Sequence, residues 1–244
     1  LSDFQVDLLY EPLAYNQRQD CFAIIQNSSV VLTKRNITHT LISDPKYPPT
    51  AITFNPEGTA LLVSLENGHL GSFDLHFDQH SIDSRLSWES DELSSQHFAQ
   101  RNHLLISDAY IFVGTESGRI CRITRSNSDE RKFYESTGDK PILGLALSPD
   151  GQSLLTTNAD GLITLFNVNN PNPLFQLQSI QIGVKGLVFS PCGRYFAAGD
   201  YGWDRRLVLF SIENQEIKEI SSHKLGVQTT AIFWGKDYIL STHT

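Results

Sequence analysis

The chain has 244 residues, 40% of them hydrophobic, and its 27 acidic and 19 basic residues give a formal net charge of −8. This acidic balance argues against general binding to a nucleic-acid backbone, which requires a basic surface. The chain contains no apolar run of 18 or more residues, so the sequence predicts no membrane span. It starts at Leu1 without a signal-peptide pattern.

The N-terminal part of the chain is predicted to form short strands. Residues 3–9 alternate between polar and apolar positions and are typical of an edge strand. Residues 21–26 and 30–35 are predicted to pair as a hairpin, which residues 37–43 continue. The Lys-Tyr-Pro-Pro segment at 46–49 is predicted to interrupt the strands.

The rest of the chain is predicted to form strand-rich units separated by polar segments. We interpret residues 76–101, the most polar stretch, as a long loop with one weak strand. No linker between domains is visible, so we expect a single unit over residues 1–244. Its predicted blades lie near residues 12–43, 50–75, 103–124, 142–168, 184–212 and 229–244, the last of them incomplete.

A turn motif recurs in these units. Each copy has an apolar strand before the turn and another after it, and the turns lie at residues 55–58, 148–151, 190–193 and 235–237. The residues that precede these turns are spaced by 93, 42 and 45 positions, so the period is about 45 residues. That spacing is typical of the blades of a WD-repeat β-propeller. We therefore expect an all-β propeller, with five to six blades of a seven-bladed ring in this chain.

The ends of the chain suggest that it is part of a longer protein. The sequence has no methionine, not even at position 1, and residues 239–244 end inside a repeat. We therefore expect a fragment whose ring is incomplete.

The cysteines and histidines predict no metal site and no cofactor. Cys21, Cys121 and Cys192 are far apart and form no CxxC pair, which argues against a zinc site or a disulfide framework. Cys121 alternates within a predicted strand and is expected in the core. Reduced thiols fit a nuclear and cytoplasmic location. His76 and His80 have ligand spacing only for a helix, but they lie in the predicted polar loop.

No catalytic motif is present, because the sequence lacks a G-x-S-x-G elbow, a P-loop, a GxGxxG segment and an HExxH segment. Trp203 followed by Arg205 and Arg206 resembles a binding hot spot, although an ordinary turn explains the same residues. Asp160 lies in a turn where an Asp often accepts hydrogen bonds from the backbone or from a His. The residues alone therefore favour a structural role for Asp160.

Three segments of the chain resemble the Fizzy and Fizzy-related family, the WD-repeat activators of the anaphase-promoting complex. Residues 3–11 (DFQVDLLYE) resemble the family's opening segment. Residues 199–211 (GDYGWDRRLVLFS) match the position and length of the family's Gly-Gly-Gly-Thr-x-Asp-Arg insertion and the strand after it. Residues 225–244 resemble the family segment that ends in Ser-Thr-His-Gly.

The resemblance implies a non-enzymatic degron receptor in cell-cycle control. Its partners would be degron-containing substrate proteins and subunits of the anaphase-promoting complex, without nucleic acid or membrane. Asp3 would pair with the arginine of a destruction box, and Gln228 would contact a Lys-Glu-Asn box. Together with the turn residues, the expected degron-binding set is Asp3, Gln228, Asp160, Trp203 and Arg205.

Some positions differ from the family pattern. Tyr10, Ala159 and Gly202 stand where the family has acidic or small polar residues, which predicts weaker recognition of the Lys-Glu-Asn box. The alternative function is a generic WD-repeat scaffold in another multiprotein assembly, such as a trafficking or RNA-processing complex. A propeller hydrolase would need carboxylate and His ligands at matching positions in successive blades, and the sequence has none.

Overall fold

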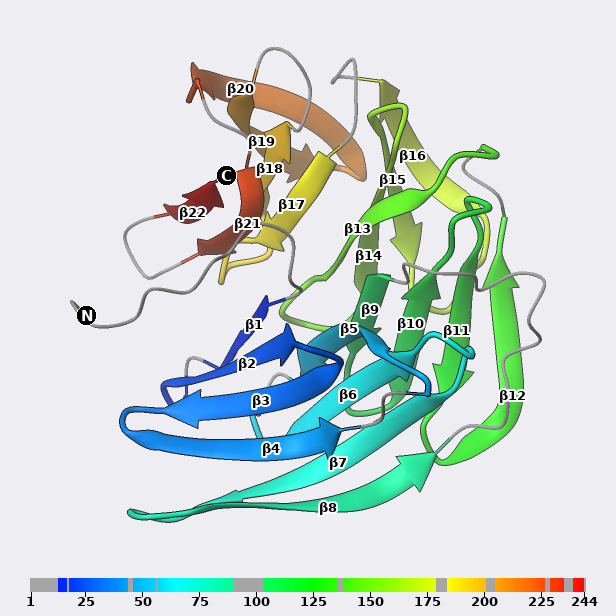
Figure 1. Cartoon of the computed structure of the whole chain (residues 1–244). Helices are drawn as coiled ribbons and strands as arrows, with labels where there is room; N and C mark the ends of the chain where they lie inside the picture. Colours follow the sequence, from blue (N-terminus) through cyan, green and yellow to red (C-terminus); the bar gives the residue numbers. More distant parts are fainter. Residues whose placement is uncertain are drawn as a thin grey trace.

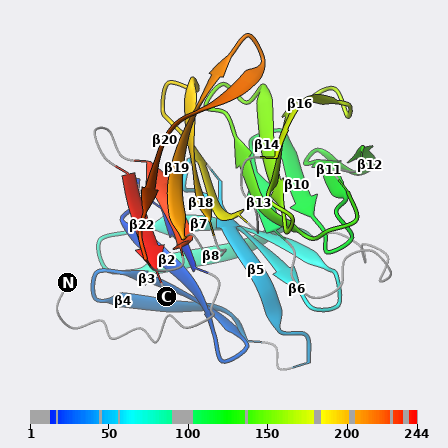
Figure 2. The ribbon, with the colours of Figure 1, turned by 90° about the horizontal axis from the view of Figure 1, so that it is seen from above.

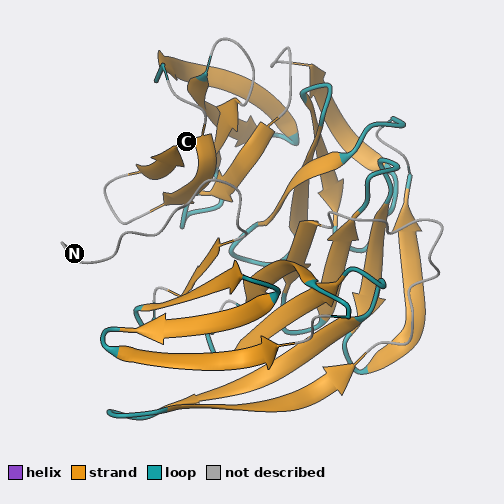
Figure 3. Ribbon diagram, in the orientation of Figure 1, coloured by secondary structure: helices purple, strands orange, loops and turns teal. Residues whose placement is uncertain are grey.

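The computed structural model describes residues 13–16, 18–43, 46–55, 57–89, 103–135, 138–178, 184–200, 205–226, 229–234 and 239–243. These residues form strands and turns (Figure 3). None of the described segments includes a helix long and apolar enough to cross a membrane. The predicted edge strand at residues 3–9 lies outside the described residues.

Within these ranges the strands form five four-stranded sheets and one two-stranded sheet, all antiparallel and with neighbours in chain order. We number the sheets 1 to 6. Sheets 1 to 3 comprise β1 (Leu13–Asn16), β2 (Cys21–Gln26), β3 (Ser29–Lys34), β4 (Ile37–Ser43); β5 (Pro49–Phe54), β6 (Ala60–Leu65), β7 (Leu70–Phe77), β8 (Ile82–Glu89); and β9 (His103–Ile106), β10 (Tyr110–Gly114), β11 (Ile120–Thr124), β12 (Asn127–Tyr134). Sheets 4 to 6 comprise β13 (Ile142–Leu147), β14 (Ser153–Asn158), β15 (Leu162–Asn167), β16 (Pro173–Gln178); β17 (Val184–Phe189), β18 (Tyr195–Asp200), β19 (Arg206–Glu213), β20 (Glu216–Lys224); and β21 (Thr229–Trp234), β22 (Ile239–His243).

The sheets follow one another around a common centre as the blades of a propeller (Figures 1 and 2). The first strand of each sheet packs against the first strand of the next, from β1 through β5, β9, β13 and β17 to β21. The fourth strands lie at the outside of the arc (Figure 1). The repeat period therefore corresponds to one sheet, as the sequence predicts.

Apolar residues between neighbouring sheets form the core. One buried cluster joins sheets 1 and 2, a second joins sheets 2 and 3, a third joins sheets 3 and 4, and the last joins sheets 4 and 5. The second and third strands are covered on both faces, so their apolar runs are continuous, as in β6 and β15. A single sheet could not bury these faces alone, and stacking is what stabilises each of them. Cys121 is fully buried, which confirms its predicted place in the core.

The sequence-based units stop one strand too early. The fourth strands β12, β16 and β20 follow the predicted units 103–124, 142–168 and 184–212 and were not predicted. These strands are mostly exposed at the sheet edge, as the pattern of β20 shows, so they have little apolar periodicity. The strand expected within residues 76–101 is present as β8, but it is a regular eight-residue strand, and β7 extends to Phe77. Residues 90–102 of the expected loop lie outside the described residues.

The repeat is also visible in the strand register. In all five four-stranded sheets the register shifts between the third and fourth strands, and it shifts between the first and second strands in sheets 2, 4, 5 and 6. Such bulges increase the local twist and make an exposed edge a poorer template for pairing.

A buried arginine links sheets 3 and 4. Arg122 on β11 donates from Nη1 to the carbonyl oxygen of Val168 at 2.9 Å, and its guanidinium lies 4.2 Å from the Tyr110 ring centroid. Tyr134 also donates its hydroxyl hydrogen to the Val168 oxygen, and burial raises the pKa of Tyr134 to about 12. In the described part of the chain, Arg122 forms no ion pair. Its Nη1 donates to oxygens of Val168 and Asn169 and its guanidinium lies against the Tyr110 ring, whereas its Nε is buried without a hydrogen-bond partner.

We expect packing to account for most of the contribution of Arg122 to stability. Arg122→Ala should cost about 2–4 kcal/mol because it leaves a cavity beside Tyr110. Arg122→Met should cost less than about 1.5 kcal/mol, because it fills similar volume and Val168 keeps the Tyr134 hydrogen bond. Urea unfolding of both variants measures the difference. Equal losses would show that the polar contacts, and not the volume, are what matters.

Candidate functional site

The antiparallel topology gives the propeller two different faces. The links between sheets and the turns between second and third strands lie on one face, which we call the linker face. The turns between first and second strands, and between third and fourth strands, lie on the opposite face. Two of the predicted degron-binding residues, Asp160 and Arg205, are described, and both belong to the linker face of neighbouring sheets. Asp3, Trp203 and Gln228 lie outside the described residues, as do Tyr10 and Gly202.

Asp160 lies in the turn between β14 and β15, with its side chain exposed. The turn is held by Asn158, whose Oδ1 accepts hydrogen bonds from the backbone N–H groups of Asp160 (3.1 Å) and Leu162 (3.0 Å). The Asp160 carbonyl oxygen accepts a hydrogen bond from Gln178 Nε2 at 2.6 Å. The structural role expected of the Asp160 side chain is therefore performed by buried Asn158, and the Asp160 carboxylate faces solvent.

Arg205 directly precedes β19 and has a positive φ of 48°. Its Nη1 donates to the carbonyl oxygen of Gly226 at 2.8 Å, and its own carbonyl oxygen accepts a hydrogen bond from the N–H of Leu225. Arg205 therefore fixes the segment that leads from β20 towards β21. The guanidinium remains exposed at the linker face and has donors left for another molecule.

On the opposite face, the recurrent turn between first and second strands is built from the same contacts in three sheets. The side chains of Asn55, Ser148 and Ser190 accept hydrogen bonds from backbone N–H groups five residues ahead, at 2.8, 2.9 and 3.1 Å. The glycines that end these turns have φ angles of +73°, +70° and +71°, which glycine adopts without strain. Sheets 1 and 3 join their first two strands through different segments, so the motif marks sheets 2, 4 and 5 among the described turns.

The third position of the turn differs between the sheets. Asp150 Oδ1 accepts hydrogen bonds from Ser148 Oγ and from the N–H of Gln152, and these contacts lower the pKa of its carboxyl group. Cys192 takes the equivalent place in the Ser190 turn, with Sγ 3.3 Å from Ser190 Oγ. That hydrogen bond, followed by the Arg194 backbone N–H, lowers the pKa of the exposed thiol to about 7. The turn thus favours a negative charge at this position.

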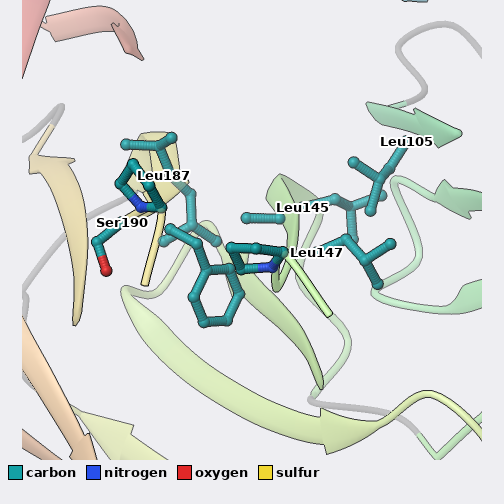
Figure 4. Close-up of a pocket in the computed structure, with 10 residues that line it drawn as sticks. Leu105, Leu145, Leu147, Leu187 and Ser190 are labelled. Atoms are coloured by element: carbon teal, nitrogen blue, oxygen red, sulfur yellow. The ribbon is translucent and has the colours of Figure 1, made fainter. Parts of the chain in front are cut away.

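An open apolar groove of about 270 Å³ lies between these turns. Leu105 of β9, residues 145–147 of β13 with Pro149 after it, and residues 187–191 of β17 and its turn form its walls. Figure 4 shows the leucine side chains from three neighbouring first strands around the same space. Sequence reasoning missed this groove because strand leucines are also what a propeller core requires. The one sequence signal was a proline at the second position of both flanking turns.

The described residues contain no group of three or more His, Cys, Asp or Glu side chains that could hold a metal ion. His76 lies near the end of β7 and His80 in the turn before β8, both exposed. The described surface presents turns, an apolar groove and exposed charged side chains.

Comparison with known proteins agrees with the fold. A family model described as "WD domain, G-beta repeat" matches residues 129–167 and 173–211. The two stretches start in β12 and at β16 and end in β15 and β19, so each joins the fourth strand of one sheet to the first three of the next. A chain in the "Crystal Structure of Mitotic Checkpoint Complex" superposes with a TM-score of 0.78 at 17% identity, covering 97% of this chain and 73% of that one. The β-propeller domain of Cps50 (Swd1) from Myceliophteria thermophila gives 0.66 at 15% identity, covering 95% and 79%.

The chain is therefore an all-β propeller that contains WD40 repeats; propellers of this class are generally non-enzymatic scaffolds. Over 100 residues it is 31% identical to ASTRA-associated protein 1 of Verticillium alfalfae. The match covers 38% of this chain and 24% of that protein, so it spans about a quarter of the relative's length. The two structural neighbours, at 15–17% identity, establish the fold and not a function.

Proposed function

We propose that this protein is a non-enzymatic WD-repeat scaffold of a multiprotein assembly, acting in the nucleus and cytoplasm. The observation that carries the proposal is the matched region shared with a protein named for its association with ASTRA. The expected partner is accordingly an ASTRA-type assembly. The acidic charge and the repeated WD40 sheets agree with a surface that binds proteins.

The degron-receptor hypothesis is the second candidate, and it rests on the resemblance of residues 3–11, 199–211 and 225–244 to the Fizzy family. Among the residues it needs, Asp160 presents a free carboxylate and Arg205 a partly free guanidinium on the linker face. A destruction-box peptide would have to contact Asp3 as well.

Purification of the intact tagged protein from its own cells, followed by mass spectrometry of the bound proteins, tests both candidates. Recovery of ASTRA components, with no enrichment of subunits of the anaphase-promoting complex, supports the scaffold proposal. The reverse result, together with micromolar binding of a destruction-box peptide that Asp3→Ala abolishes, would favour the degron receptor. Recovery of no assembly at all would contradict both.

A further inference from the structure

The apolar groove is built for an apolar side chain and not for a large ligand. Its walls are leucines from three neighbouring sheets, and Leu105, Leu145 and Leu187 are only half-buried (Figure 4). Small-molecule sites usually enclose about 300–1,000 Å³, whereas this groove measures about 270 Å³ and is open. Protein interfaces commonly place one bulky anchor side chain in such a pocket and surround it with polar contacts.

The charged groups in the turns next to the groove favour a lysine or arginine beside the apolar side chain that would enter it. Pro149 and Pro191 line the groove, and Asp150 and Cys192 are the residues that follow them in the two turns. The Cys192 side has Arg194 beside the thiol.

The Asp150 side has no matching cation. Its carboxylate accepts hydrogen bonds from Ser148 and Gln152 but, among the described residues, meets no Lys or Arg. Residues 141–184 contain no basic residue at all. On the β9 side, the turn that holds Asp108 already has Arg125, whose Nη1 bonds to the carbonyl oxygens of Ser107 (3.2 Å) and Asp108 (3.3 Å). Asp150 is therefore the acidic residue of these turns that, among the described residues, has no cation beside it.

We propose that the groove between β9, β13 and β17 is a docking site for a partner protein segment in which a leucine-like side chain lies next to a lysine or arginine. The apolar side chain enters between the leucines, and the cation lies against Asp150. This inference rests on the proposed scaffold function, because it assigns one contact surface to it.

The test uses methyl-labelled intact protein and two capped tetrapeptides, Lys-Leu-Leu-Lys and Glu-Leu-Leu-Glu, followed by NMR. Titration with the lysine peptide should shift the methyl signals of Leu145, Leu147 and Leu187. The glutamate peptide should bind at least about fivefold more weakly, because a favourable charge contact becomes a repulsive one. Asp150→Asn should reduce the affinity for the lysine peptide about threefold.

Two surface variants separate loss of the site from loss of the fold. Pro191→Arg places a long cation at the exposed edge of the groove and should abolish detectable binding of the lysine peptide while the thermal unfolding midpoint stays within a few degrees. Ile220→Arg on β20 is the matched control. This side chain is 51% exposed and lies on an outer strand, so binding should be unchanged.

The proposal is overturned if the two peptides bind equally, if the shifts fall outside the groove, or if Ile220→Arg and Pro191→Arg behave alike. Its failure is distinguishable from failure of the scaffold function. Co-purification of the assembly with wild-type and Pro191→Arg protein alike would leave the scaffold standing and remove the groove from it. Peptide binding in the groove without co-purification of the assembly would support the groove as a binding site and contradict the scaffold function.

Discussion

Gly58→Ala should destabilise the protein by about 3–5 kcal/mol, although the same change at Gly151 should cost only about 1–2 kcal/mol. Both glycines end the recurrent turn with nearly equal φ angles, +73° and +70°. A Cβ at Gly151 meets nothing within 4 Å, whereas a Cβ at Gly58 would overlap the amide end of Asn16. Both substitutions therefore introduce the same backbone strain. The additional destabilisation by Gly58→Ala comes from the overlap of the new Cβ with Asn16.

The Asn16 side chain cannot simply move away. It is 3% exposed, donates from Nδ2 to the Gly58 carbonyl oxygen at 2.7 Å, and accepts at Oδ1 a hydrogen bond from the N–H of Gln19 at 3.2 Å. Making room would break contacts that join sheets 1 and 2. Urea unfolding of the single variants and of Asn16→Ala combined with Gly58→Ala forms a double-mutant cycle. In the Asn16→Ala background the cost of Gly58→Ala should fall to the Gly151→Ala value. No such fall would contradict this explanation.

Cys192 should react with iodoacetamide with a midpoint near pH 7, about two units below an ordinary exposed thiol. At pH 7 roughly half of it is thiolate, compared with about one per cent at the ordinary pKa, and after correction for lower nucleophilicity the rate should be about five- to tenfold higher. Below pH 7 the thiol gains its proton and the rate falls. Cys21 and Cys121 should stay unlabelled in the folded protein, because burial raises the pKa of both to about 11.

Peptide mass mapping after labelling between pH 5 and pH 10 measures these rates for each cysteine. Ser190→Ala removes the hydroxyl that contributes most to lowering the Cys192 pKa, so the midpoint should rise towards 9.0. Arg194→Ala keeps the backbone N–H that also lowers this pKa and serves as the control, with a much smaller change expected. A wild-type midpoint near pH 9 would show that the turn does not stabilise the thiolate.

The inner part of each blade could be predicted from the sequence. The turns at 55–58, 148–151 and 190–193 recur with apolar strands on both sides because these three blades use the same side-chain-to-backbone hydrogen bonds and a positive φ at the closing glycine. The fourth strands β12, β16 and β20 escaped prediction, since an edge strand exposed to solvent carries little apolar signal.

The candidate sites were less accessible to sequence reasoning. Asp160 was correctly expected in a turn, and Arg205 directly precedes β19. Only the three-dimensional contacts show that Asn158 holds the Asp160 turn and that Arg205 binds the Gly226 carbonyl group. The degron-binding role of these two residues stays a prediction. Asp3, Trp203 and Gln228 lie outside the described residues.

Local sequence by itself determined the inner strands of the blades, the blade period of about 45 residues and the recurrent turn, because these depend on contacts between residues a few positions apart. The tertiary structure alone decided which leucines are core and which line the groove, that Asn16 packs on Gly58, and that Arg122 meets Val168. These pairs are 42 and 46 positions apart. Such contacts form only when one sheet packs against the next, and no periodicity within a single blade specifies them.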